Sequence, residues 1–259
     1  MTEISQDTRS IAKAMTIAGS DSGGGAGIQA DLKTFAALGV YGTSVLTAIT
    51  AQNTVGITTV ETISPVVVSA QIDSVLGDFD VKAVKTGMLA TRSLVTEVCG
   101  RLEAYSRIPV VVDPVMISTS GHRLLDDDAV ELVRTRLLPI ARVVTPNRLE
   151  AEALTGHSID SFASAAQAST RLRELGATAV VITGGHFDGP DAVDLLKCGS
   201  PLLRRQSQPA VDLVDIRCAR SGFPFGIMST NAAQHGQIYR TIAALAGQPL
   251  FRIAIDLHT

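Results

Sequence analysis

The sequence predicts an α/β protein in which helices cover a central, mostly parallel β-sheet. Apolar runs of strand length that end in Gly, Asp, Asn or Pro alternate with runs of helix length, which is the pattern of repeated βα units. The core must be aliphatic, because 46% of the 259 residues are hydrophobic, 4% are aromatic and Trp is absent. That composition suits a parallel sheet buried on both faces.

The elements can be placed in order along the chain. We expect strands at residues 14–18, 44–50, 83–85, 110–112, 142–144 and 179–182. We expect helices at residues 28–38, 65–76, 93–105, 127–138, 149–154 and 164–175. No repeat, low-complexity segment or linker precedes about residue 200, so we predict one domain over 1–259 with an N-terminal extension at 1–13. The region from about 200 to 259 is atypical, with a short helical stretch near 238–246 and an apolar run at 251–257.

Charge and cysteine content exclude several classes of protein. The net charge is -3 and the basic residues are scattered, which argues against nucleic acid or a membrane surface as a partner. Cys99, Cys198 and Cys218 are widely spaced without a CxxC pair, which argues against a disulfide framework and a zinc site. No apolar stretch reaches the roughly 18 residues of a membrane span, and no signal peptide is evident. We therefore expect a cytoplasmic protein.

Polar and glycine-rich residues follow each of the six predicted strands. In open α/β sheets the ligand crevice lies beyond the carboxyl ends of the strands, so these turns predict one shared site. The glycine-rich segment 18–31 lets the backbone approach a ligand, and the helix after it offers N–H groups to an anion. A turn that needs glycine only for packing explains the segment equally well. The chain contains neither a Walker-type phosphate loop nor a dinucleotide fingerprint.

Six motifs follow one another along the chain: AGSDSGGGAGIQADLKT (18–34), TAQNTVG (50–56), KTGML (85–89), VVDPVM (111–116), LLPIARVVTPNRLEAEALTG (137–156) and VITGGH (181–186). In sequence and in order they resemble the motifs of the hydroxymethylpyrimidine/phosphomethylpyrimidine kinases of the ribokinase-like superfamily. The resemblance runs from Met15 to about Leu196. It implies a three-layer α/β/α fold, a homodimer, and phosphorylation of hydroxymethylpyrimidine and its monophosphate with ATP and Mg²⁺ in thiamine biosynthesis. A pyridoxal or pyridoxine kinase and a non-catalytic pyrimidine-binding protein are the alternatives.

The resemblance implies a set of substrate-binding residues. It places Gly19 and Asp21 against the pyrimidine and its hydroxymethyl arm. Gln52 would pair with the ring nitrogen and the amino group, because a neutral amide both donates and accepts hydrogen bonds. Met88 and Val115 would flank the ring. Taken alone, these two apolar residues fit a place in the core equally well.

The resemblance also implies nucleotide-binding and metal-binding residues. Asp113, Asn147, Thr183 and Gly185 would bind the nucleotide, with Thr183 at a position where the family commonly has Lys. Asp113 and Glu150 would serve the Mg²⁺ ion, which keeps several waters and takes few protein ligands. Alone, Asp113 also fits a turn residue and Glu150 a first-turn acid favoured by the helix dipole.

The C-terminal region departs from the family at the catalytic motif. Members carry a Thr-His-Gly-Thr-Gly-Cys-Thr segment whose amides form an anion hole, and this chain lacks it. Cys218 falls in that neighbourhood and is the candidate catalytic residue, without the flanking glycines. Three explanations stay open: a weakly active or inactive relative, a frameshift or misplaced gene end, and a local solution that uses Arg217, Cys218 and Gly222.

Overall fold

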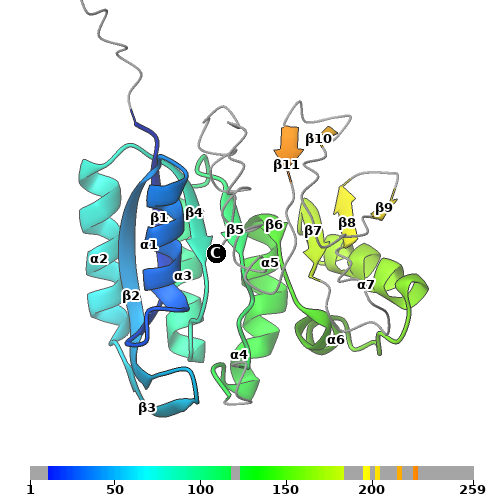
Figure 1. Cartoon of the computed structure of the whole chain (residues 1–259), viewed down its shortest axis with the longest axis horizontal. Coiled ribbons are helices and arrows are strands. Elements are labelled where there is room, and N and C mark those ends of the chain that lie inside the picture. Colours follow the sequence, from blue (N-terminus) through cyan, green and yellow to red (C-terminus); the bar gives the residue numbers. More distant parts are fainter. Residues whose placement is uncertain are drawn as a thin grey trace, which may run out of the picture.

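The computed structural model describes residues 11–117, 123–183 and 195–198, and the backbone of residues 202–204, 215–217 and 224–226. Its centre is a nine-stranded sheet in the order β3-β2-β1-β4-β5-β6-β7-β8-β9, and in Figure 1 the strands run from β2 on the left to β9 on the right. The strands are β1 (Lys13–Asp21), β2 (Tyr41–Gln52), β3 (Ile57–Thr62), β4 (Val81–Thr86), β5 (Val110–Val112), β6 (Ala141–Val144), β7 (Ala179–Ile182), β8 (Leu195–Cys198) and β9 (Leu202–Arg204). A separate pair consists of β10 (Asp215–Arg217) and β11 (Pro224–Gly226).

The six predicted strands are all present, and they are parallel to one another from β2 through β1 and β4 to β7. Strands β3, β8 and β9 are antiparallel to their neighbours and were not predicted. After β1 the chain adds β2 on one side, and β4 then pairs with β1 on the other side. The order of strands therefore reverses at β1, and ligands bind at such a switch point in open α/β sheets.

The helices follow the prediction with one exception. They are α1 (Gly27–Ala37), α2 (Pro65–Asp78), α3 (Arg92–Ala104), α4 (Asp127–Leu132), the π-helical turn η1 (Val133–Leu137), α5 (Leu138–Ile140), α6 (Arg148–Thr155) and α7 (Phe162–Glu174). The helix predicted at 127–138 is present as three consecutive helical segments, because η1 interrupts it and α5 extends it to Ile140. Pro139 lies just after η1, and proline has no N–H for the preceding helical turn.

Two apolar clusters lie on opposite faces of the sheet. Val110 and Val112 point into the larger cluster, whereas Val111 between them points into the smaller one, as the two-residue period of a strand requires. Helices α2 to α7 pack on the larger cluster, and α1 packs through Phe35 on the smaller one. Helices therefore cover both faces, which confirms the three-layer α/β/α arrangement (Figure 1).

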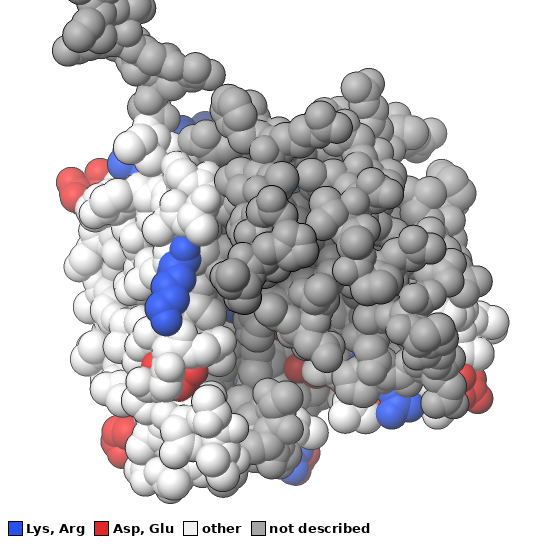
Figure 2. Space-filling view, viewed as in Figure 1, with Lys and Arg blue, Asp and Glu red and all other residues white. Residues whose placement is uncertain are grey.

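Charged side chains are spread thinly over the face drawn in Figure 2, where those of the described residues do not gather into a patch. Among the described residues, no helix combines the length and the apolar character needed to cross a membrane.

Candidate active site

A pocket of about 380 Å³ lies at the carboxyl ends of the parallel strands. Its lining comes from the ends of β1 and β2 and from the turns after β1, β4, β5, β6 and β7, which confirms that polar residues at these strand ends share one pocket. The predicted turn at residues 184–186 lies outside the described part of the chain. The lining includes every candidate residue within the described part of the chain: Gly19, Asp21, Gln52, Met88, Asp113, Val115, Asn147, Glu150 and Thr183. The remaining two candidates, Gly185 and Cys218, lie outside the described residues.

Asp21 organises the glycine-rich loop between β1 and α1. Its carboxylate accepts hydrogen bonds from the backbone N–H groups of Gly23 at 2.7 Å, Gly25 at 2.9 Å and Ala26 at 2.8 Å. The N–H of Gly24 donates to the Asp21 carbonyl oxygen at 3.0 Å. These loop amides already have an acceptor, so in this conformation they do not point at a ligand. The start of α1 is different, because no side chain caps it at Ala26.

Glycine is required where α1 begins. Gly27 has a φ of 54°, and a Cβ there would lie 2.2 Å from the carbonyl oxygen of Gly19. A Cβ on Gly19 would in turn lie 3.2 Å from the sulfur of Met88. Both glycines therefore keep side chains out of the place where the helix start, β1 and Met88 meet at the pocket.

Gln52 ends β2, and the turn around it is fixed by hydrogen bonds. Its backbone N–H donates to the Ser22 hydroxyl at 2.7 Å, and that hydroxyl donates to the Gln52 carbonyl oxygen at 2.6 Å. The hydroxyl of Thr50 lies 3.0 Å from the Gln52 side-chain oxygen and donates to it. The same hydroxyl also lies 3.0 Å from the Ser20 carbonyl oxygen, so Thr50 links the ends of β1 and β2 beside the half-buried Gln52 amide, which lines the pocket.

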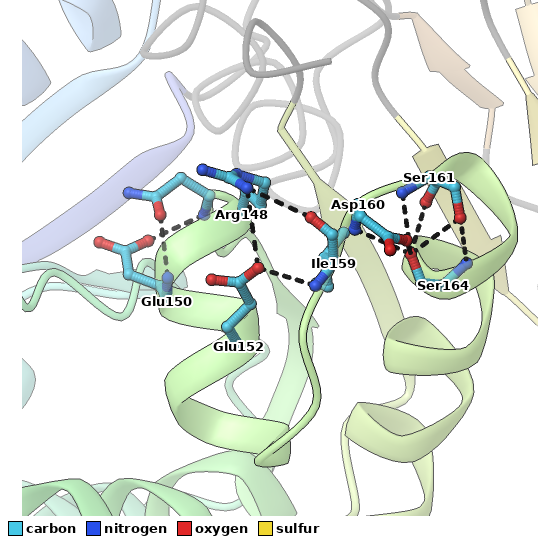
Figure 3. Close-up of polar contacts among 8 residues, drawn as sticks. Arg148, Glu150, Glu152, Ile159, Asp160, Ser161 and Ser164 are labelled. Atoms are coloured by element: carbon cyan, nitrogen blue, oxygen red, sulfur yellow. Dashed lines mark hydrogen bonds and ion pairs between the residues drawn. The ribbon is translucent and has the colours of Figure 1, made fainter. Parts of the chain in front are cut away.

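Asn147 and Glu150 form a capping box at the start of α6, where Figure 3 labels Glu150. The Asn147 side chain accepts from the Glu150 N–H at 2.9 Å, and the Glu150 carboxylate accepts from the Asn147 N–H at 2.9 Å. The second carboxylate oxygen accepts from the N–H of Met116 at 3.4 Å. Glu150 is thus a first-turn acid of α6, as the helix-start interpretation expected, and it also joins the turn after β5 to the turn after β6, which that interpretation did not include.

The loop that follows α6 is tied back to this helix. Figure 3 shows Arg148 reaching the carbonyl oxygen of Ile159, at 3.3 Å, and Glu152 accepting from the Ile159 N–H, at 2.7 Å. Ser161 and Ser164 form a second capping box at the start of α7. The contacts of Arg148 and Glu152 with Ile159 tie the loop to α6, and the capping box at Ser161 begins the next helix.

The carboxylates of Asp113 and Glu150 make the pocket electrostatically suited to a cation. Burial and the negative charge of Asp113 raise the pKa of Glu150 to about 8, although two backbone N–H groups oppose the shift. Asp113 follows β5, and its side chain is 14% exposed. No cluster of three or more His, Cys, Asp or Glu side chains suited to a metal occurs among the described residues. Two carboxylates nevertheless fit Mg²⁺, which takes one or two of them together with water and phosphate oxygens.

Two buried charged residues that the sequence interpretation did not single out, Lys85 and Asp31, lie beneath this site. The ammonium of Lys85, at the end of β4, is 3.2 Å from both carboxylate oxygens of Asp31 on α1 and 3.3 Å from Asp113. The hydroxyl of Thr16 on β1 also donates to Asp31. Burial opposes the charge on Lys85, but the carboxylates of Asp31 and Asp113 prevail and raise its pKa. The sequence feature that could have drawn attention to Lys85 is a lysine at a buried position near the end of strand β4.

Comparison with known proteins identifies relatives over most of the chain. The model of the phosphomethylpyrimidine kinase family matches residues 21–210. The hydroxymethylpyrimidine/phosphomethylpyrimidine kinase of Rhizobium meliloti is 54% identical over 193 residues, which cover 74% of this chain and 72% of the relative. The Bacillus subtilis protein of the same name is 46% identical over 196 residues, which cover 75% of this chain and 72% of the relative.

Solved structures of similar proteins point to the same relatives as the sequence comparison. The phosphomethylpyrimidine kinase of Clostridium difficile superposes with a TM-score of 0.71 at 44% identity, covering 76% of this chain and 85% of that one. The Bacillus subtilis pyridoxal kinase, solved as an ADP complex, superposes with a TM-score of 0.77 at 33% identity, covering 93% of this chain and 86% of that one. The expected ribokinase-like fold is thereby confirmed. By sequence and by structure, the chain belongs to the phosphomethylpyrimidine kinase family.

Proposed function

We propose that this chain transfers phosphate from ATP to 4-amino-5-hydroxymethyl-2-methylpyrimidine and to its monophosphate, a step in thiamine biosynthesis. The observation that carries the proposal is the pocket, which is lined by all the candidate site residues in the described part of the chain, at one edge of the sheet. Relatives named hydroxymethylpyrimidine/phosphomethylpyrimidine kinase at 54% and 46% identity support the choice of substrate.

The order of the strands supports a separation of the two substrates between the ends of the pocket. Gly19 lies near the end of β1, Gln52 ends β2 and Met88 follows β4, and this end of the pocket is proposed for the pyrimidine. Asn147 and Thr183 follow β6 and β7, and this end is proposed for the nucleotide. The turn after β5 lies between the two ends. Val115 in that turn would contact the ring, which brings the hydroxymethyl group toward the γ-phosphate.

Asp113 and Glu150 would hold Mg²⁺ through its water shell at the centre of the pocket. When bound, the ion would neutralise charge on the transferred phosphoryl group. The protein's own contribution is to place the two carboxylates, Glu150 through its backbone hydrogen bonds and Asp113 through its contact with Lys85. The raised pKa of Glu150 supports this proposal, because a buried carboxyl beside another carboxylate gains from a nearby cation.

A coupled ATP-consumption assay tests the proposal, with hydroxymethylpyrimidine, its monophosphate and pyridoxal compared in parallel. Turnover of both pyrimidines with a higher kcat/KM than pyridoxal is the expected result. Gln52→Leu should cost about 1–3 kcal/mol in pyrimidine binding, because ring donors and acceptors lose their hydrogen-bond partner when the bound ring excludes water. Unchanged pyrimidine affinity in Gln52→Leu, measured by calorimetry, would contradict the assignment of the pyrimidine end.

Pyridoxal phosphorylation is the second candidate, and the structural similarity to the Bacillus subtilis pyridoxal kinase over 93% of the chain favours it. The pyridoxal ring also carries a hydroxymethyl group and matches the pyrimidine in size. Preference for pyridoxal in the parallel assay would therefore replace the leading proposal without changing the reaction class.

The missing catalytic segment bears on the rate of transfer more than on binding. Substrate binding draws on residues such as Gly19, Gln52 and Met88, whereas the amides that hold the transferred phosphoryl group in the family would come from the segment that this chain lacks. We therefore expect a pyrimidine KM in the family's range with kcat lower by orders of magnitude. A kcat within the usual ~1–100 s⁻¹ of kinases would overturn this expectation. The homodimer and the cytoplasmic location stay predictions, and analytical ultracentrifugation tests the dimer.

A further inference from the structure

We propose that Thr47, in the middle of β2, is a positioning residue that fixes Met88 at the pyrimidine end of the pocket and thereby sets the affinity for the ring. The inference rests on the proposed function, which places Met88 beside the pyrimidine. It adds to the site a residue that neither lines the pocket nor belongs to the six sequence motifs.

A bulge in β2 lies beside Met88. The pairing of β1 with β2 shifts register at Gly19, which lies opposite two residues of β2, Thr47 and Ala48. Both of these residues are fully buried. The Thr47 hydroxyl donates to the Met88 carbonyl oxygen at 2.6 Å, and a Cβ on Gly19 would lie 3.2 Å from the Met88 sulfur. Bulges occur next to active sites, where they re-aim a side chain, and this one joins three elements at the edge of the pocket.

The turn that carries Met88 is strained and is held from outside. Ala90 has a φ of 59°, which a residue with a Cβ rarely adopts, and the Thr91 N–H donates across it to the Leu89 carbonyl oxygen at 2.7 Å. Strained turns persist where the surrounding structure holds them, and they cluster at binding sites. Here the Ala90 carbonyl oxygen accepts from the N-cap residue of α4 at 2.9 Å, and the Met88 carbonyl oxygen accepts from Thr47.

Loss of the Thr47 hydroxyl would act on the Met88 side chain through its backbone. The hydrogen bond is buried, so without it the Met88 carbonyl oxygen is left unpaired and the turn gains by moving toward another donor or toward water. Such a movement displaces the Met88 sulfur, which lies against Gly19. Contacts between a ring and an apolar side chain weaken steeply when a gap of a fraction of an ångström opens between them. The hydroxyl therefore influences ring binding without touching the ring.

Two substitutions at Thr47 separate the hydroxyl from the volume of the side chain. Thr47→Val keeps the shape and removes the donor, whereas Thr47→Ser keeps the donor and removes a methyl group. Hydroxymethylpyrimidine should bind about tenfold more weakly to Thr47→Val and within about twofold of the wild type to Thr47→Ser. Thr43→Val is the matched control, because Thr43 lies on the same strand, donates to the Ala14 carbonyl oxygen at 3.1 Å and does not line the pocket. Its pyrimidine affinity should equal that of the wild type.

The experiment uses the full-length protein and two measurements. Calorimetry with hydroxymethylpyrimidine and, separately, with ADP gives the affinities, and the ADP affinity should be the same in all variants. Nuclear magnetic resonance of the ligand-free protein labelled with ¹³C at the methionine methyl groups follows Met88 directly. The chain has five methionines, so the spectrum is simple, and the signal missing from Met88→Leu identifies Met88. Thr47→Val should shift that signal, whereas Thr47→Ser and Thr43→Val should leave it in place.

Unchanged pyrimidine affinity together with an unmoved Met88 signal in Thr47→Val would overturn the inference and leave Thr47 a structural residue. Equal weakening in Thr47→Val and Thr47→Ser, in step with their melting temperatures, would also contradict it, because stability and not the hydroxyl would then set the affinity. If the wild type binds no pyrimidine, the proposed function fails, and the Met88 signal alone decides whether Thr47 positions this residue. If Thr47→Val does not fold, Thr47→Cys replaces it, since a thiol is a weak donor of similar size.

Discussion

Replacing Asp21 with Asn tests whether this residue braces the glycine-rich loop or contacts the substrate. The family resemblance places Asp21 against the pyrimidine, whereas in the structure its carboxylate accepts three backbone N–H groups of its own loop. Asparagine keeps the volume and one acceptor oxygen. It replaces the second oxygen, which binds Gly25 and Ala26, with an NH₂ group that cannot accept either N–H.

The size of the effect follows from those two hydrogen bonds. Hydrogen bonds to a charged group contribute about 1.5–3 kcal/mol each, so losing two costs roughly 3–6 kcal/mol at most. Ser22 and Gly25 are on the surface side of the loop, where water can replace part of the loss. We therefore expect the free energy of unfolding to fall by about 2–4 kcal/mol. Pyrimidine binding should weaken as well, since the loop lines the pocket.

Urea unfolding of the ligand-free protein measures the first quantity, and calorimetry with hydroxymethylpyrimidine measures the second. Asp78→Asn, at the exposed end of α2, is the control and should change neither. The reasoning is refuted if Asp21→Asn unfolds within about 0.5 kcal/mol of the wild type and yet loses pyrimidine affinity, because surface substitutions without a structural role stay within that range. Asp21 would then be a substrate ligand and not a brace.

Three further predictions concern the pH dependence of stability, thiol reactivity and the glycine-rich loop. The pKa of Glu150 is about 8 in the folded protein, against an ordinary value of 4.5. The protonated carboxyl therefore contributes fully to the free energy of unfolding below pH 4.5, and this contribution is lost as the pH rises toward 8. Unfolding measured in chelator from about pH 5 to about pH 9 should show the loss in the wild type and not in Glu150→Gln. Burial raises the pKa of the Cys99 thiol to about 12, so alkylation mapped by mass spectrometry should modify Cys99 only after denaturant is added, and early modification would contradict its burial. Gly27→Ala should lower the free energy of unfolding by more than the roughly 1–2 kcal/mol that a left-handed backbone costs, because the added Cβ also meets the Gly19 carbonyl oxygen. The control Gly100→Ala, within α3, has open space around its Cβ and should raise the free energy of unfolding by about 0.5–1 kcal/mol. Equal effects of the two substitutions would refute the steric argument.

The sequence by itself determined the parallel sheet and the place of the site. Runs such as Val110–Val112 are apolar throughout and end in turn residues, which are local features that tertiary packing does not override. Parallel strands bring their carboxyl ends to one edge, so the convergence of Gln52, Asp113 and Asn147 in one pocket followed from strand direction alone.

The tertiary structure decided what depends on partners distant in the sequence. Strand β3 (Ile57–Thr62) is mostly exposed and exists through its pairing with β2, so its own residues carry a weak signal. The contact between Lys85 and Asp31 joins residues 54 positions apart, on a strand and a helix that meet when α1 packs on the sheet. A lysine on a strand or an aspartate on a helix has many possible neighbours along a chain. The packing of whole helices and strands decides which partner each charged side chain faces. Burial of apolar surface fixes the positions of the elements, and the charged groups then pair with the neighbours that this packing gives them.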